Sequence, residues 1–303
     1  MFDILVAGEI NPDLILSGNV IPEFGQAEKL VDSATLAIGS SSAIFACGAA
    51  RLGLHVAFIG VCGDDVFGRF MLDEMSKRNV DVSNVIVRSD QQTGLSVILN
   101  QDADRAILTH PGLIAALQAA DVSDNLLRQS RHLHVASYFL QTKLQPDLPA
   151  FFKHARSLGL TTSLDTNYDP SEKWLGFDEL LTATNVFLPN EKEAMSLSGA
   201  DNIKEAATRL QFKVEALAIK LGADGALGIR NNEIVRVPSI PVKVVDTVGA
   251  GDSFDAGFIY GYLQGWTMEK SLRAAAICGA LSTQKSGGTS AQPTLNEVMS
   301  ELS

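Results

Sequence analysis

The chain alternates short apolar runs with segments in which apolar residues recur every three or four positions. Continuous apolar runs are typical of strands buried on both faces of a parallel sheet, and the longer repeat is typical of helices that cover it. The pattern predicts strands at residues 3–8, 56–59, 132–136, 161–165, 185–188 and 215–220. It predicts helices at residues 67–78, 146–157, 190–197, 202–211, 250–263 and 267–284. We therefore expect an α/β fold, doubly wound, with a mostly parallel central sheet and helices on both faces.

Two segments break this alternation. Residues 14–36 are short, β-like and interrupted by glycine and proline, and residues 93–110 predict a hairpin around a polar turn. Both are expected to form a small β flap, or lid, beside the main sheet. A second hairpin, 227–229 with 234–237, is predicted around a turn of two asparagines. No linker or internal repeat divides the chain, so we expect one domain over residues 1–303.

A glycine turn stands between an apolar run and a helix near the C-terminal end. Residues 242–245 predict the end of a strand, and apolar residues at helical spacing after Asp252 predict a helix that begins near Gly249. Residues 246–254, which join them, read Asp-Thr-Val-Gly-Ala-Gly-Asp-Ser-Phe. Glycine lets the backbone approach a ligand, and a helix start offers unpaired N–H groups and a partial positive charge. The turn is therefore typical of a phosphate site.

Asp252 lies on the first turn of this predicted helix, beside the place where an anion would bind. Two interpretations fit the residue alone: an acidic residue that caps the helix, or a general base that faces a phosphoryl acceptor. The N–H groups of Gly249, Ala250 and Gly251 are candidates for an anion hole. Phosphoryl transfer needs such parts, because it depends on positioning, charge neutralisation and a group that takes the hydroxyl proton.

Composition narrows the class of partner. The chain has 303 residues, of which 46% are hydrophobic and 19% are charged, and its net charge is −11. These values favour a globular protein, and an acidic balance without a run of Lys or Arg disfavours nucleic-acid binding. No apolar run reaches the roughly 18 residues that a membrane span needs. Because Cys47, Cys62 and Cys278 are odd in number and set among apolar residues, we expect buried thiols in a cytoplasmic protein.

The glycine turn closely resembles the C-terminal signature of the ribokinase-like (PfkB) family of carbohydrate and nucleoside kinases. Three weaker motifs precede it in the order of that family: a Gly-Ser turn at 39–44, an Asn-x-x-Glu element at 190–193, and a glycine loop at 220–225. The matches extend from residue 3 to residue 293. The resemblance implies a ribokinase-like fold and an ATP- and Mg²⁺-dependent kinase that phosphorylates a hydroxyl of a small sugar or sugar acid.

The resemblance also assigns roles to the residues of the transfer site. It makes Asp252 the general base and the turn at 249–251 the anion hole. It places Asn190 and Glu193 near Mg²⁺ through water, although a helix cap explains the same pair. It further implies a monovalent cation such as K⁺, held mainly through carbonyls in the segments that contain Asp246, Val248 and Gly288.

Two sets of residues would bind the substrates. On the acceptor side the resemblance points to Asp13, which could accept hydrogen bonds from two sugar hydroxyls or could be a plain surface carboxylate. The other acceptor-side candidates are Asn11, Gly39, Ser40, Ser41 and Arg105. The serines also fit a helix cap, and the arginine also fits a solvated hairpin tip. The nucleotide-side candidates are Asn190, Lys220, Gly222, Gly225, Thr247, Gly249, Gly251, Ala276 and Gly279.

Two positions depart from the family pattern. Ser40 stands where the family has a glycine, and Ile44 stands where it has an asparagine that usually binds a sugar hydroxyl. An apolar side chain cannot replace those hydrogen bonds. Either another group binds that hydroxyl, or the acceptor lacks it or places it elsewhere.

Other classes of function stay open at this point. A nucleoside kinase of the same family and a non-catalytic sugar- or nucleotide-binding module are the alternatives, because fold alone does not exclude them. The intact glycine turn and Asp252 favour the enzyme. A dinucleotide oxidoreductase is disfavoured, because no Gly-x-Gly-x-x-Gly motif follows the first strand. The edge strands of the flap would permit a homodimer.

Overall fold

A large sheet forms the centre of the molecule. A computed structural model describes residues 1–101, 104–169, 171–174 and 176–303. Within them, nine strands pair in the order β15-β14-β13-β12-β11-β10-β1-β4-β6, and all neighbours are parallel except β13-β14 and β14-β15. These strands are β1 (Phe2–Ala7), β4 (Val56–Ile59), β6 (Val80–Asp81), β10 (Ser130–Val135), β11 (Thr161–Leu164), β12 (Val186–Phe187), β13 (Ala216–Lys220), β14 (Ala226–Arg230) and β15 (Glu233–Val237). The predicted mostly parallel α/β sheet is confirmed.

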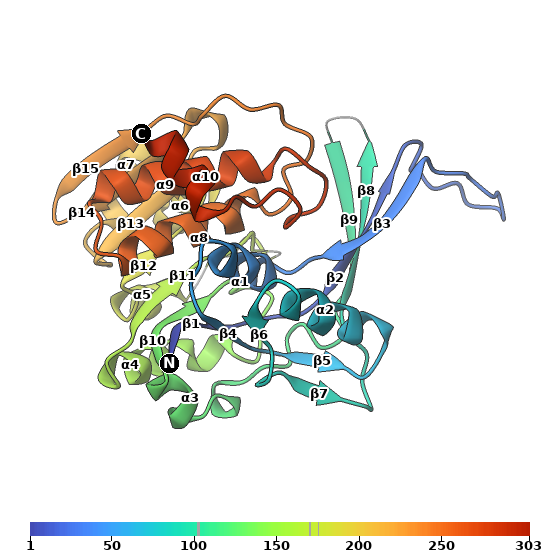
Figure 1. The fold of residues 1–303 in the computed structure, drawn as a ribbon, viewed down its shortest axis with the longest axis horizontal. Coiled ribbons are helices and arrows are strands. Elements are labelled where there is room, and N and C mark those ends of the chain that lie inside the picture. Colours follow the sequence, from blue (N-terminus) through green and yellow to red (C-terminus); the bar gives the residue numbers. More distant parts are fainter. Residues whose placement is uncertain (102–103, 170, 175) are drawn as a thin grey trace.

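Helices cover both faces of this sheet (Figure 1). The α-helices are α1 (Ser41–Arg51), α2 (Val66–Ser76), α3 (Asp124–Arg128), α4 (Leu148–Ser157), α5 (Phe177–Thr182), α6 (Glu191–Ser198), α7 (Ile203–Leu210), α8 (Ala250–Leu263), α9 (Met268–Ser282) and α10 (Leu295–Leu302). Short 3₁₀ turns lie at Ala119–Asp121, Gln145–Asp147 and Gly222–Asp224.

The central strands are apolar on both faces, because each face has its own core. On β1, Ile4 and Val6 join a cluster with residues of α1, α8 and α9, whereas Leu5 and Ala7 join a cluster with residues of α3 to α7. This burial on both sides explains why the strands are continuous apolar runs in the sequence. The three cysteines are buried free thiols, as predicted.

A smaller sheet projects from the body (Figure 1). It pairs β3 (Ser33–Ile38), β2 (Pro12–Ser17), β8 (Leu95–Gln101) and β9 (Asp104–His110) in that order. It therefore unites the two segments predicted as a flap. Part of the predicted polar turn, residues 102–103, lies outside the described residues. A two-stranded sheet, which the sequence pattern did not predict, pairs β5 (Val61–Gly63) with β7 (Ile86–Arg88).

One predicted strand is wrong. Residues 242–245 are not part of a strand, and Val244 and Val245 are more than half exposed. The segment is fixed to the end of α9 by backbone bonds from Val245 and Asp246 to the carbonyl of Thr283, at 2.8 and 3.1 Å. Val242 and Val244 instead line a surface cavity. The late hairpin is confirmed, and both asparagines at its turn have positive φ.

Among the described residues, no helix combines the length and the apolar character needed to cross a membrane. The assignment of residues 1–303 to one domain, and a cytoplasmic location, stay predictions. The parallel strands place their carboxyl ends at one edge of the sheet, which is where ligands bind in such folds. Segments that follow β1, β11, β12 and β13 meet the start of α8 at this edge.

Candidate active site

The glycine turn is the start of α8, as predicted. Gly249 is the N-cap residue with φ of 73°, a conformation that favours glycine, and a side chain there would collide with Gly288 and Ile44. Among the described residues, the N–H groups of Gly249 and Gly251 have no hydrogen-bond acceptor, and that of Ala250 makes one long bond of 3.3 Å to Thr247. The turn therefore offers unpaired N–H groups at a helix N-terminus, which suits an anion.

Asp252 lies one residue beyond this turn and borders a cavity. Only 8% of the residue is exposed. Burial, with the charge of Asp165, raises the pKa of Asp252 to about 8, against the lowering effects of Lys220 and of a hydrogen bond from Ser41. A carboxyl with a pKa near neutrality is suited to exchange a proton. Within the part of the chain that the structure describes, this side chain makes no capping hydrogen bond at the start of α8.

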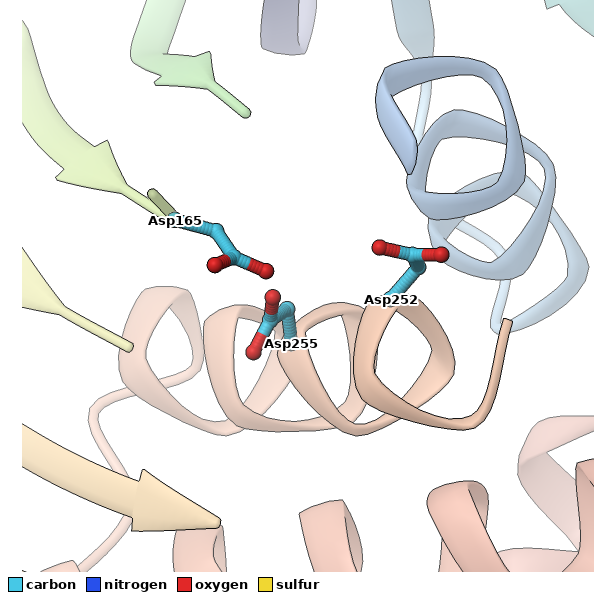
Figure 2. A group of neighbouring side chains, drawn as sticks. All are labelled: Asp165, Asp252 and Asp255. Atoms are coloured by element: carbon cyan, nitrogen blue, oxygen red, sulfur yellow. The ribbon is translucent and has the colours of Figure 1, made fainter. Parts of the chain in front are cut away.

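A buried charged cluster lies beside Asp252 (Figure 2). Asp165, which follows β11, and Asp255, one turn further along α8, face each other, and Lys220 from the end of β13 pairs with both. The Lys220 Nζ atom is 3.0 Å from Asp165 Oδ2 and 3.1 Å from Asp255 Oδ1. Burial disfavours the charged ammonium, but the two aspartates outweigh it and raise the pKa of Lys220. Lys220 is one of the predicted nucleotide-side residues, whereas Asp255 was not predicted from the sequence.

A polar cavity of about 610 Å³ contains most of the residues predicted for the acceptor side, and we call it the acceptor cavity. Asp13 on β2 lines it, and Gly39 makes room for this side chain, since a Cβ atom on Gly39 would lie 2.2 Å from Asp13 Oδ1. Asn11 also lines it and donates to Ser96 Oγ at 3.4 Å. Burial raises the pKa of Asp13 to about 7, although the charge of Arg105 lowers it. The structure therefore brings Asp13, Asn11 and Gly39 together, as the sequence suggested.

The start of α1 forms the floor of this cavity. Ser40 has φ of 65°, and its hydroxyl donates to the Glu9 carbonyl at 2.7 Å and accepts from Ala43 N at 3.0 Å. Glu9, which is buried, also accepts from Ser42 Oγ at 2.5 Å and Ser137 Oγ at 2.8 Å. Ser40 is thus a helix cap that also borders the cavity. Sequence reasoning did not predict that Glu9 would connect these serines.

The flap forms another wall of the acceptor cavity. Arg105 on β9, an exposed residue, lines it together with the flap residues Ser96, Ile98, Ile107 and Thr109. Ile44 lines it from α1 and packs against Gly249 and Gly288. The position of the family asparagine is therefore inside the acceptor cavity, where its replacement changes a polar contact to an apolar one.

A second cavity, of about 660 Å³, also borders the glycine turn. We call it the nucleotide cavity, because it contains most of the residues predicted for the nucleotide side. Apolar residues and backbone dominate its walls, and Lys220 is its charged residue. It contains the predicted nucleotide-side residues Gly222, Gly225, Thr247, Gly251, Ala276 and Gly279. The two nearby glycines differ: a Cβ on Gly225 would lie 2.0 Å from the Val237 carbonyl, so a tight turn explains it, whereas a Cβ on Gly222 would meet open space.

Asn190 and Glu193 form a full capping box at the start of α6. Glu193 accepts from Asn190 N at 2.9 Å and from Asn190 Nδ2 at 2.6 Å, and Asn190 Oδ1 accepts from Glu193 N at 2.9 Å. Burial, with the charge of Asp165, raises the pKa of Glu193 to about 7. Both residues also line the acceptor cavity. Capping and contact with the cavity therefore coexist in this pair.

Asp246 connects two loops beside the glycine turn. Its carboxylate accepts from Val248 N at 3.0 Å and from Gly287 N at 2.9 Å. Gly288, in the second loop, packs against Gly249. Asp246 and Gly288 line neither cavity, whereas Val248 lines the acceptor cavity.

Comparison with known proteins identifies the family of this chain. A sequence profile described as "pfkB family carbohydrate kinase" matches residues 1–295. The chain belongs to the pfkB family of carbohydrate kinases. It is 30% identical to the ATP-dependent ribose-1-phosphate kinase of Halopiger xanaduensis, over 100% of this chain and 99% of that protein. It is 31% identical to the 2-dehydro-3-deoxygluconokinase of Bacillus subtilis, over 85% of this chain and 84% of that protein.

Solved structures give the same fold. A protein of E. coli described as a Ribokinase II, in complex with ATP and Mg²⁺, has a TM-score of 0.86 to this pfkB family member. Sequence identity is 23%, and the match covers 100% of this chain and 99% of that one. The predicted family and ribokinase-like fold are therefore confirmed. The roles of individual residues stay predictions that rest on the geometry above.

Proposed function

We propose that this carbohydrate kinase transfers the γ-phosphate of ATP to a hydroxyl of a sugar or sugar acid, with Asp252 as the general base. One observation carries the proposal. The apolar cavity and the polar cavity meet at the glycine turn, because both are lined by Lys220, Gly222, Thr247 and Gly251. A nucleotide in the first cavity and a sugar in the second would therefore place the transferring group over the N–H groups of the turn.

The transfer follows from this arrangement. Asp252 takes the proton of the acceptor hydroxyl as the hydroxyl oxygen forms its bond to the γ-phosphorus. The bond from that phosphorus to the bridging oxygen breaks, and ADP leaves. The N–H groups of Gly249 and Gly251 and the ammonium of Lys220 face the charge on the phosphoryl oxygens. The polarity of the acceptor cavity, with Asp13 and Asn11, supports a substrate that carries several hydroxyls.

Asn190 and Glu193 fit Mg²⁺ in an indirect role. Both carboxylate oxygens of Glu193 already accept hydrogen bonds from Asn190, so contact through water fits better than direct ligation. Mg²⁺ typically keeps several waters, which suits such a pair. When bound, Mg²⁺ would neutralise part of the charge on the phosphates. A solved structure of the same fold that contains ATP and Mg²⁺ supports this choice of nucleotide and metal, and the roles of Asn190 and Glu193 rest on their contacts in this chain.

Two further proposals concern the segments around the site. Asp246 ties the loops of Val248 and Gly288 together, so their carbonyls are candidates for a K⁺ site. On the flap, β9 is an edge strand, and Ile107 and Leu108 on it are 52% and 61% exposed. Exposed apolar edges favour pairing, which supports a homodimer through the flap.

An ADP-release assay over sugars, sugar acids and nucleosides tests the function. We expect MgATP-dependent turnover on a sugar or sugar acid. Asp252→Asn should lower kcat by about a thousandfold. MgATP binding by calorimetry should be retained, because Asp252 borders the acceptor cavity and not the nucleotide cavity. Turnover only on nucleosides would favour a nucleoside kinase, and ligand binding without turnover would favour a binding module. An Asp252→Asn variant with more than a tenth of the activity would contradict the role of the base.

A further inference from the structure

Lys220 occupies the junction of the two cavities. Of the four residues that line both, it is the charged one. Its Nζ atom lies 3.6 Å from the place where a Cβ atom on Gly251 would stand, so the ammonium rests against the glycine turn. A cation at this point faces both the nucleotide phosphates and the acceptor. Its position therefore decides which oxygens it neutralises.

Asp255 and Asp165 hold this ammonium in place by hydrogen bonds. Lys220 Nζ donates to both carboxylate oxygens of Asp255 at 3.1 Å and to Asp165 Oδ2 at 3.0 Å. The side chains are 12%, 1% and 5% exposed for Lys220, Asp255 and Asp165. Carboxylate oxygens of Asp165, Asp252 and Asp255 lie within 4.8 Å of one another, a spacing that would also suit a cation. Lys220 already pairs with two of the three, so the chain supplies a cation to this cluster itself.

We propose that Asp255 is a positioning residue for phosphoryl transfer, which with Asp165 holds the Lys220 ammonium under the glycine turn. The proposal rests on the proposed function of the site. A lysine side chain has four rotatable bonds and a compact charge, so it moves to the nearest anion unless it is fixed. Asp252 is such an anion when it is ionised. Asp255 and Asp165 keep the ammonium from pairing with the base and leave it directed at the phosphoryl group.

Stability alone does not account for Asp255. Replacing a buried ion pair with apolar residues of similar volume is often neutral or stabilising. Asp255 nevertheless lies in α8 among the buried residues Phe254, Ala256 and Phe258. Burial among these apolar side chains disfavours the ionised carboxylate, and the charge of Lys220 offsets part of that penalty. A carboxyl at so unfavourable a position points to a role in the site beyond stability.

Calorimetry with MgATP and MgADP, without acceptor, tests the position of the ammonium. A cation at the junction faces the γ-phosphate, which ADP lacks. Lys220→Met and Asp255→Leu should each weaken MgATP binding by about tenfold and MgADP binding by less than about twofold. Equal losses for both nucleotides, or no loss in a folded variant, would overturn the proposal. This experiment does not need turnover, so its result is separate from the failure of the proposed function.

Measurements of kcat test whether Asp255 has only a structural role. Asp255→Asn keeps an oxygen that accepts from Lys220, so its kcat should stay within about threefold of the wild type, whereas Asp255→Leu should lose about 100-fold. Lys220→Met should lose at least as much, and adding Asp255→Leu to it should cost less than about threefold more, since no ammonium remains to be positioned. Penalties that multiply would refute the proposal. If Asp255→Leu does not fold, Asp255→Ser, which is too short to reach Lys220, replaces it in both experiments.

Discussion

The two cavities that meet at the glycine turn have different walls. The nucleotide-side cavity is lined by backbone and by apolar side chains such as Val242, Val244 and Ala276. The acceptor-side cavity is lined by buried carboxyls, among them Glu9, Asp13 and Asp252. We therefore expect the first to select its ligand by shape and the second to select its ligand by hydrogen bonds and charge. A change of volume should affect ATP, and a change of polarity or pH should affect the acceptor and the chemistry.

The largest expected effect is on the pH dependence of the reaction. Burial raises the pKa of Asp252 to about 8, and a base must be ionised to take a proton. Below that pKa, kcat/KM should rise by about tenfold for each pH unit, because the ionised fraction of the free enzyme does so. Initial rates from pH 5.5 to 9.5, with an acceptor that has no ionisable group in this range, measure it. A profile that is flat between pH 6 and pH 8 would show that another group limits the rate.

A larger side chain in the nucleotide cavity should have the next largest effect, and the effect should be on the KM for ATP. Ala276 on α9 is buried and borders the nucleotide cavity but not the acceptor cavity. Ala276→Phe should raise the KM for ATP by about tenfold or more, because overpacking costs on the order of 1–3 kcal/mol. The KM for the acceptor should stay within about twofold, and a thermal melt should verify folding. A rise confined to the acceptor KM would reverse our assignment of the two cavities.

Ile44 sharpens the comparison on the acceptor side. Ile44→Asn restores the amide of the family pattern inside the acceptor cavity. It should change the ranking of acceptors by several-fold in kcat/KM, on the order of one hydrogen bond, and leave the KM for ATP within about twofold. Ile44→Val, which stays apolar, is the matched control and should preserve the ranking. If ATP affinity changes and the ranking does not, Ile44 does not face the acceptor.

The smallest effect concerns the stability of the ligand-free protein. Burial raises the pKa of Asp13 and Glu193 to about 7 and that of Asp252 to about 8, whereas the ordinary values are 3.8 for Asp and 4.5 for Glu. Between pH 4 and pH 8 the native state therefore binds more protons than the unfolded state, so stability falls as pH rises through this window. The melting temperature should be lower at pH 8.5 than at pH 5.5 by several °C.

The matched variant for this melt is Asp252→Asn, which removes one of the three carboxyls. Its melting temperature should depend less steeply on pH than that of the wild type. A variant with an unchanged slope would show that Asp252 does not carry a raised pKa in the folded protein. The nucleotide-side variant Ala276→Phe should leave the slope unchanged, because that cavity contains no buried carboxyl among its lining residues.

The sequence predicted what depends on local pattern. The parallel strands, the helix that begins after Gly249 and the flap follow from periodicity and turn residues, because burial on both faces and helix starts leave local marks. The residues around Asp252, Asp13 and Asn190 could be placed in one site because each belongs to a motif with a fixed position relative to a strand or helix.

What the sequence did not predict depends on how distant elements meet. Asp255 pairs with Lys220 only because α8 packs against the ends of β11 and β13, and no local pattern gives that register. The available signal was a second acidic residue on the face of Asp252, in a helix that is otherwise apolar. The predicted strand end at residues 242–245 was wrong for a related reason, because apolar residues can line a cavity as well as continue a sheet.

The placement of Asp252 and Asp255 on α8 has a consequence for how the acceptor specificity of this enzyme can change. The helix α8 begins at the glycine turn and carries both Asp252, the proposed base, and Asp255, the proposed positioning residue, so one helix sets their spacing (Figure 2). The flap contributes Ser96, Ile98 and Arg105 from a separate sheet. New acceptors can therefore be acquired by exchanging flap residues while the catalytic geometry stays untouched, which makes the flap the natural target for engineering altered sugar specificity.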